Sequence, residues 1–115
     1  MTEIKAVIRP NKLPMVRSAL MDTPGFPGMT VTKVEGCSAP ARVEKTTIKD
    51  ELTDYSAKVR IEIVCSDDVA DAIMDRLVQA CQTGQVGDGI VWKVNVEKAY
   101  FIAKNYPNPI TNPTN

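Results

Sequence analysis

The sequence predicts an α+β domain with a ferredoxin-like fold, in which two helices cover one face of an antiparallel sheet. The chain of 115 residues has the length of one domain. Its periodic segments follow the order strand, helix, strand, strand, helix, strand, which is the split βαβ pattern. A long segment without any period separates the second predicted strand from the third. The sheet should therefore carry one extended loop between these two strands.

The first strand and the first helix are marked by a change of period near Pro10. Residues 3–9 alternate as in a half-buried strand, and the residues on its apolar face are Ile4, Ala6 and Ile8. Pro10 ends that strand, and Asn11 is a suitable N-cap for a helix. Apolar residues then recur at helical spacing, namely Leu13, Val16, Ala19 and Leu20. Helix breakers between residues 23 and 28 end this helix.

Two further strands flank the segment that has no period. β-branched residues predict a second strand over residues 29–35, which Gly36 stops. Residues 57–65 alternate without a break and predict the third strand, whose inward residues are Val59, Ile61, Ile63 and Cys65. The intervening loop, residues 37–55, exceeds the ~12 to 15 residues usual inside a compact domain. Loops of this length are usually functional or disordered, so this one is a candidate for interaction.

The last part of the chain predicts a second helix, a fourth strand and an irregular tail. Ser66, followed by two aspartates, is a suitable N-cap, and Gly84 occupies the position expected for a C-terminal cap. The apolar stripe of this helix comprises Val69, Ile73, Met74, Leu77, Val78, Ala80 and Cys81. Residues 91–96 predict the fourth strand, whose apolar face carries Trp92, Val94 and Val96. Pro- and Asn-rich residues 105–115 predict a tail that follows a domain of residues 1–104.

Charge and composition exclude several classes of function. Lys plus Arg equals Asp plus Glu at 14 each, so the basic surface of a nucleic-acid binder is missing. Without histidine there is no Ser-His or Cys-His nucleophile pair. Cys37, Cys65 and Cys81 form no Cys-x-x-Cys pair, so we expect reduced thiols and no metal site. No apolar run reaches the ~18 residues of a membrane span, and no signal peptide is recognisable, so we expect a cytoplasmic protein.

The segment Thr83-Gly-Gln-Val-Gly-Asp-Gly89 is the strongest candidate for a ligand site. Glycine permits positive φ and close backbone approach, so such a loop can direct its N–H groups toward an anion. A helix cap followed by a hairpin turn explains the same composition equally well. Composition alone leaves both interpretations open.

Several segments resemble the PII signal-transduction proteins. Residues 83–89 resemble their nucleotide-binding loop, Thr-Gly-x-x-Gly-Asp-Gly, and residues 4–10, 28–34 and 58–64 resemble their first three strands. The matches occur in the family's order, with the long loop in the corresponding gap, and cover roughly residues 3–102. The chain is thus identified as an atypical PII-like protein, and the carboxysome-associated, bicarbonate-responsive type is the subgroup suggested.

The resemblance implies a regulatory homotrimer, not an enzyme, which binds adenine nucleotides in clefts between its subunits. A T-loop, here residues 37–55, would dock on a target such as a membrane transporter or a metabolic enzyme. The implied phosphate contacts are Gly87, Asp88 and Gly89, to which we add the backbone N–H of Val86 as a candidate, and the implied ribose and adenine contacts are Gly36, Cys37, Glu62 and Val64. A neighbouring subunit would add Gly28, Met29 and Thr30.

Departures from the family's pattern affect the residues that hold phosphate. The family's lysine after Gly-Asp-Gly is Ile90 here, and two arginines near the C-terminal end are Phe101 and Ala103. The Gly-Arg-Gln that opens the T-loop is replaced by residues 37–39, Cys-Ser-Ala. Its glutamine helps to hold magnesium and 2-oxoglutarate, so the second effector should be another small anion, with bicarbonate the first candidate.

The missing cations predict an altered nucleotide preference. Each lost hydrogen bond to a charged phosphate forfeits on the order of 1.5 to 3 kcal/mol. ADP or AMP carries fewer charges than ATP, so either should bind more tightly than ATP. Arg9, Lys58 or Lys104 would then act as substitute cations beside the backbone N–H groups of residues 86–89.

Two other classes of function remain as alternatives. A small phosphohydrolase on the same fold would need a general base and electrophiles, for which Asp88 with Arg9 or Lys58 is the best available set. A trimeric structural or metal-tolerance protein would have to bind a soft metal through isolated Cys37 or Cys65. Steady phosphate release that disappears in an Asp88 variant would identify the first alternative.

Overall fold

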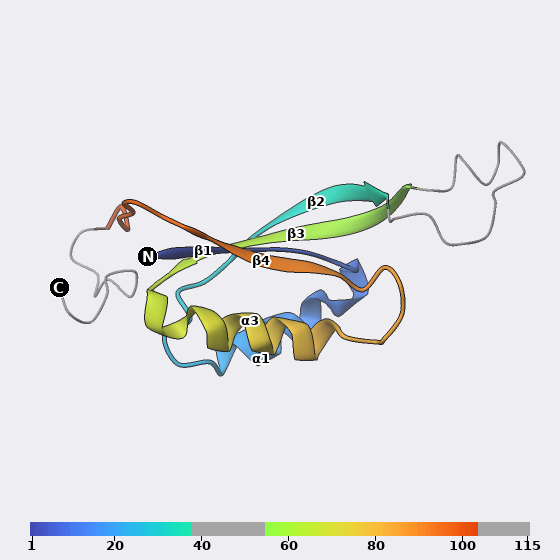
Figure 1. Ribbon diagram of the computed structural model, residues 1–115, viewed down its shortest axis with the longest axis horizontal. Coiled ribbons are helices and arrows are strands. Elements are labelled where there is room, and N and C mark those ends of the chain that lie inside the picture. The colour runs from blue at the N-terminus through green and yellow to red at the C-terminus, as the bar shows by residue number, and fades with distance from the viewer. Residues whose placement is uncertain (38–54, 104–115) are drawn as a thin grey trace, which may run out of the picture.

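The computed structural model describes residues 1–37 and 55–103, which form a four-stranded sheet with two α-helices on one face (Figure 1). The strands are β1 (Thr2–Ile8), β2 (Thr30–Cys37), β3 (Tyr55–Cys65) and β4 (Gly89–Asn95). A 3-10 turn, η1 (Pro10–Lys12), precedes α1 (Leu13–Met21), and the second α-helix is α3 (Asp67–Cys81). The strands lie in the order β2-β3-β1-β4, and each neighbouring pair is antiparallel. The predicted ferredoxin-like fold is confirmed.

The core lies between the helices and the inner face of the sheet. In the β1–β3 pair Ile4 lies opposite Ile63 and Ala6 opposite Ile61, and all of these side chains are buried. Helix α1 adds Val16 and Leu20, and α3 adds Ala70, Ile73, Leu77 and Cys81. Burial of one large aliphatic side chain contributes about 1.5–3 kcal/mol. This packing fixes the strand ends from which the candidate site is built.

The two helices begin and end differently from the prediction. Asn11 lies inside η1, so it is not the N-cap; α1 begins at Leu13, after Lys12, without a side-chain cap. Ser66 occupies the N-cap position of α3, but its side chain makes no capping hydrogen bond. Gln82 is the C-terminal cap of α3 and has extended backbone angles. Gly84 therefore belongs to the following loop and does not end the helix.

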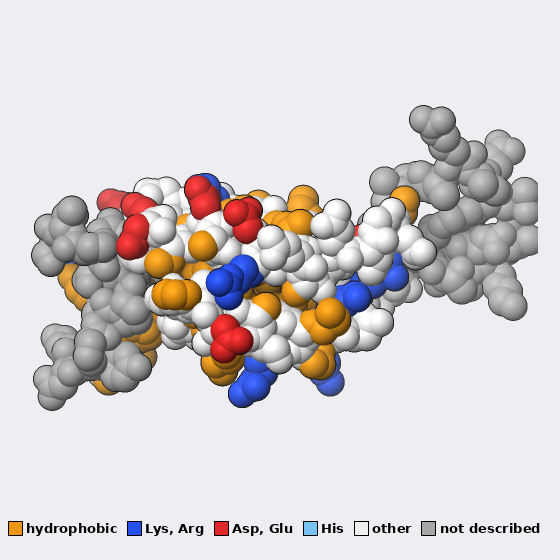
Figure 2. All heavy atoms as spheres, turned by 90° about the horizontal axis from the view of Figure 1, so that it is seen from below, with side chains coloured by type: hydrophobic (Ala, Val, Ile, Leu, Met, Phe, Trp, Pro, Cys, Tyr) orange, Lys and Arg blue, Asp and Glu red, His pale blue; other side chains and the backbone are white. Residues whose placement is uncertain are grey.

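The apolar stripe of α3 differs from the prediction at two residues, Ala70 and Val78. Val78 is 45% exposed, whereas Ala70, outside the predicted stripe, is buried. Ala70 and Leu77 are seven residues apart and share one face of a helix, while Val78 lies about 100° further round. Figure 2 views the helix-covered face and shows apolar side chains interspersed with acidic and basic ones. Acidic and basic side chains are thus both present on this face.

The predicted apolar face of β4 points away from the helices. Trp92 lies opposite Lys5 and Val94 opposite Glu3, so they share the outer face of the sheet, and Val96 follows the end of the strand. Val91 is the β4 residue that packs against the core. The alternation of β4 predicts which of its residues share a face. It does not predict which of the two faces the helices cover, because β4 lies at the edge of the sheet.

The base of the T-loop belongs to the sheet. Gly36 does not stop β2, since Gly36 pairs with Ser56 and Cys37 with Tyr55. Residues 38–54 and 104–115 lie outside the described residues, so the interior of the T-loop and the predicted tail remain predictions. Among the residues that the structure describes, no helix is both long and apolar enough to span a membrane.

Candidate functional site

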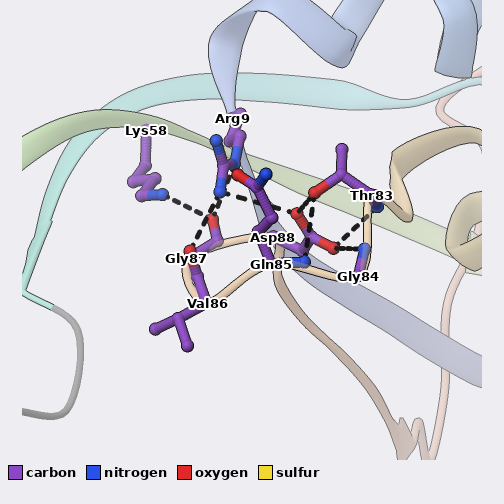
Figure 3. A network of polar contacts seen from close by, with 8 residues as sticks. All are labelled: Arg9, Lys58, Thr83, Gly84, Gln85, Val86, Gly87 and Asp88. Carbon is purple, nitrogen blue, oxygen red and sulfur yellow. Dashed lines mark hydrogen bonds and ion pairs between the residues drawn. The ribbon is translucent and has the colours of Figure 1, made fainter. Parts of the chain in front are cut away.

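The loop between α3 and β4 is closed by the side chain of Asp88 (Figure 3). Its carboxylate accepts hydrogen bonds from the backbone N–H groups of Thr83, at 2.7 Å, and Gly84, at 2.9 Å. The Thr83 hydroxyl also donates to this carboxylate, and the N–H of Gln85 donates to the same hydroxyl at 3.3 Å. Asp88 therefore acts as the internal brace of the loop.

Two cationic side chains reach this loop from different strands. Arg9, directly after β1, donates from Nε to the Gly87 carbonyl at 3.1 Å and from Nη2 to the Val86 carbonyl at 2.9 Å. Lys58 on β3 donates from Nζ to the Gly87 carbonyl at 2.8 Å (Figure 3). Arg9 Nη2 also lies 3.5 Å from Asp88 Oδ1. The loop thus has positive charge concentrated along one side.

Two glycines allow the loop to lie this close to its neighbours. Gly89 has φ +115°, and a Cβ placed there would be 2.0 Å from the carbonyl oxygen of Val7 in β1. Gly87 has φ +96°, and its Cβ would lie 3.3 Å from Arg9 Nη2. Both φ values fall in the region that side chains disfavour. Gly87 and Gly89 therefore have a defined steric role where the loop meets β1 and its neighbours.

The hydrogen bonds to Asp88 lower its pKa from 3.8 to about 2; those from Thr83 contribute most, followed by Gly84 and the charge of Arg9. A pKa depressed by folding means that the ionised carboxylate stabilises the loop above pH about 4 and that this stabilisation is lost as pH falls through about 2. We expect the amide NMR signals of Thr83 and Gly84 to titrate together with a midpoint near pH 2. Asp88→Asn should abolish the titration, and a midpoint near 3.8 would contradict the bracing role.

A cavity of about 620 Å³ opens at the opposite end of the sheet from this loop. Its lining comprises Glu3, Pro27, Gly28, Met29, Thr30, Glu62, Val64 and Phe101. Both charged lining residues, Glu3 and Glu62, are acidic. The Glu62 carboxylate is held by Lys5, with Nζ 3.7 Å from Oε2, and by Arg60, with Nε 3.4 Å from Oε1. The cavity combines apolar walls with oriented hydrogen-bond acceptors.

The predicted site residues fall into two groups at opposite ends of the sheet (Figure 1). Lys58 joins the loop residues 86–89, and Gly36 lies against its side chain, since a Cβ at Gly36 would be 3.2 Å from Lys58 Cγ. Cys37 follows Gly36 at the exposed end of β2. The other group is Gly28, Met29, Thr30, Glu62 and Val64. Glu62 and Val64 thus lie with the segment assigned to the neighbouring subunit and not with Gly36 and Cys37.

The comparison with known proteins decides the family. The model of the family described as Nitrogen regulatory protein P-II matches residues 1–106. Nitrogen regulatory protein P-II of Klebsiella oxytoca and Nitrogen regulatory protein P-II 1 of Escherichia coli (strain K12) are each 38% identical over 103 residues, covering 89% of this chain and 91% of theirs. The protein of Bradyrhizobium diazoefficiens is 37% identical over the same length. The chain belongs to the P-II family.

The family assignment removes the enzymatic alternative. P-II proteins are regulatory and not catalytic, so the expectation that the chain is not an enzyme is confirmed. The geometry agrees, because Asp88, the proposed base of a phosphohydrolase, accepts hydrogen bonds within its own loop. In this P-II chain, the described residues include no group of three or more His, Cys, Asp and Glu that could hold a metal. Cys65, one of the thiols considered as a metal ligand, is buried, and burial raises its pKa to about 11.

Sequence reasoning missed part of the cavity in this P-II protein. Arg9 was expected as a substitute cation or as an electrophile beside Asp88, and not as a residue that holds the loop through two hydrogen bonds to its carbonyls. Glu3 and Pro27 were not singled out, and Phe101 was noted only for the arginine that it replaces. Alternation along β1 places Glu3 on the outer face, where it could have been noticed. The wrapping of the chain after β4 toward the cavity leaves no such local signal.

Proposed function

We propose that this P-II protein is a cytoplasmic homotrimer that binds an adenine nucleotide between subunits, with ADP or AMP preferred over ATP. The proposal rests on the separation of the cavity and the glycine-rich loop, which lie at opposite ends of the sheet of one subunit. Glu3, at the cavity, and Arg9, at the loop, are six residues apart along β1, which is about 20 Å in a strand. A purine base and its own α-phosphate do not span this separation. One nucleotide would therefore use the cavity of one subunit and the loop of the next.

A ring of identical subunits satisfies this requirement. When each subunit offers a different surface to each neighbour, rotation closes the assembly into a ring. In a trimer every loop would meet a cavity, which gives three equivalent nucleotide sites. The outer face of the sheet, with Trp92, Val94 and Val64, would supply apolar area to the contact between subunits. A closed ring is thus a requirement of the proposed site, and a trimer is the ring that the resemblance to the family implies.

The charges favour short phosphate chains. The side-chain cations that donate to the described loop are Arg9 and Lys58, and the next position after Gly89 is Ile90, which is 62% exposed. Two cations and backbone N–H groups can balance one or two phosphates. A third phosphate would add negative charge without a further cation from this loop. ATP should accordingly bind more weakly than ADP.

The same cations offer a place for the second effector. Arg9 and Lys58 both donate to the Gly87 carbonyl, so a small anion that bound there would take over these donors. Lys58 also packs against Gly36, near the start of the T-loop. Bicarbonate at this position would link ligand binding to the docking of residues 37–55 on a transporter or metabolic enzyme. We expect it to strengthen the binding of ADP.

Isothermal titration of the full chain with AMP, ADP and ATP, each with and without bicarbonate, tests the nucleotide part. We expect ADP or AMP to bind about tenfold or more tightly than ATP, because each unmatched charged contact forfeits on the order of 1.5 to 3 kcal/mol. Tighter binding of ATP would overturn the preference, and no binding of any nucleotide would overturn the function. An ADP affinity that bicarbonate leaves unchanged would remove it as the effector.

Sedimentation equilibrium tests the assembly. We expect a mass three times the 12.6 kDa of the chain at the concentrations used for titration. A monomer that still bound ADP tightly would contradict a site shared between subunits. The comparison requires both measurements on the same sample.

A further inference from the structure

Phe101 forms one wall of the cavity at the end of the sheet. It comes from the segment after β4 and shares the cavity with Met29 and Val64, which are also partly buried. Its neighbours point elsewhere: Tyr100 is 71% exposed and Ile102 is 99% exposed. Lys98 Nζ lies 5.2 Å from the centre of the Tyr100 ring, so these two side chains interact with each other. Phe101 is thus the aromatic residue that this segment contributes to the cavity.

The cavity offers carboxylate acceptors, and no Lys or Arg is among the described residues that line it. Its charged lining residues are Glu3 and Glu62, and Lys5 Nζ lies 3.7 Å from one carboxylate oxygen of each, so the described lining provides no cation of its own for a phosphate. Their carboxylates can accept from ribose hydroxyls and from an exocyclic amine. A flat base with apolar faces fits between an aromatic ring and aliphatic side chains such as Val64. The chemistry of the cavity therefore matches the nucleoside part of a nucleotide.

We propose that Phe101 stacks on the base of the bound nucleotide. This contact would strengthen the binding of adenosine, AMP, ADP and ATP by the same factor, whatever the number of phosphates. This inference rests on the proposed function and specifies its recognition. Stacking of a base on an aromatic side chain contributes about tenfold or more in affinity, whichever base it is. Selectivity among AMP, ADP and ATP would then come from the loop of the neighbouring subunit. The two ends of the sheet, from neighbouring subunits, would thus recognise separate parts of one ligand.

Matched substitutions at position 101 separate stacking from filling of space. Phe101→Leu keeps an apolar side chain without an aromatic face, Phe101→Tyr keeps the ring, and Tyr100→Ala removes the exposed aromatic neighbour. Titration of the full chain with adenosine, AMP, ADP and ATP gives four dissociation constants for each variant. We expect Phe101→Leu to weaken all four by the same factor of about ten. Phe101→Tyr and Tyr100→Ala should stay within about twofold of the unmodified chain.

The outcomes distinguish this inference from the proposed function. If the unmodified chain binds none of the four ligands, the proposed function fails and the stacking role fails with it. If nucleotides bind and Phe101→Leu binds them equally well, the stacking role alone is overturned. A loss that grows with the number of phosphates would also overturn it, because Phe101 would then act on the phosphate end.

A measurement on the unmodified chain covers the case in which Phe101→Leu does not fold. In the ADP complex, nuclear Overhauser effects should connect the ring protons of Phe101 with the protons of the adenine base. ADP binding without these contacts would contradict stacking. Contacts from the Phe101 ring to the base of a saturating ligand would support it independently of any substitution.

Discussion

Replacing Gly89 with alanine should destabilise the protein by about 3 kcal/mol or more, as expected for a clash between backbone segments that have no room to move. A Cβ at this position would lie 2.0 Å from the Val7 carbonyl oxygen and 3.0 Å from the Val7 carbonyl carbon. Both atoms belong to the backbone of β1, which pairs with β3 on one side and β4 on the other. Relief requires Gly89 and the start of β4 to move away from β1. Urea unfolding followed by circular dichroism measures the loss.

Gly84→Ala is the matched control for this prediction. Gly84 also has a positive φ, +81°, but a Cβ there meets no atom within 4 Å. Gly84→Ala therefore measures the cost of placing alanine at a positive φ, about 1–2 kcal/mol, without a steric clash against β1. Equal losses for the two variants would show that φ alone matters and that the loop does not lie against β1 as described. A larger loss for Gly89→Ala would show that contact with β1 adds to the conformational penalty at this end of the motif.

The sheet could be predicted because its signals are local. In β1 and β3 every second residue is apolar, and the alternating positions Ile4 and Ile61 are buried as expected. The exceptions arise where tertiary contacts determine which apolar side chains are buried. Val78 is apolar but lies beyond the edge of the helix interface, and Trp92 faces away from the helices because β4 is at the edge of the sheet. Local pattern thus determines the elements, whereas their packing determines which apolar face is covered.

The candidate site was predictable in part for the same reason. The glycine-rich motif is contiguous in sequence, so residues 83–89 could be recognised as one unit. The cavity combines Glu3, Glu62 and Phe101 from separate segments, and only strand register and the path of the chain after β4 bring them together. Register places Glu62 opposite both Lys5 and Thr30. Sequence spacing does not contain that information, so the grouping of Glu62 with the Thr30 segment required the structure.

Removing both loop cations should abolish most nucleotide binding. In the double variant Arg9→Gln, Lys58→Gln we expect ADP to bind at least about a hundredfold more weakly, because each charge-assisted hydrogen bond to phosphate contributes on the order of 1.5 to 3 kcal/mol. Each single variant should lose less, since Arg9 and Lys58 converge on the same carbonyl of Gly87 and one cation remains. Titration calorimetry at constant ionic strength gives the dissociation constant of ADP for each variant. Lys93→Gln, on β4, removes one positive charge and is the charge-matched control for each single variant; Lys93 pairs with Asp71 at 2.8 Å.

Adenosine distinguishes a role in phosphate binding from a role in holding the loop. Because Arg9 and Lys58 hold loop carbonyls in the unliganded structure, their removal could also change the loop itself. A ligand without phosphate should bind the double variant within about twofold of the unmodified chain if the cations act on phosphate alone. Equal losses for adenosine and ADP would instead assign Arg9 and Lys58 to loop architecture. A hundredfold loss for ADP with adenosine unchanged would place the phosphate beside these two side chains and leave nucleoside recognition to the other end of the sheet.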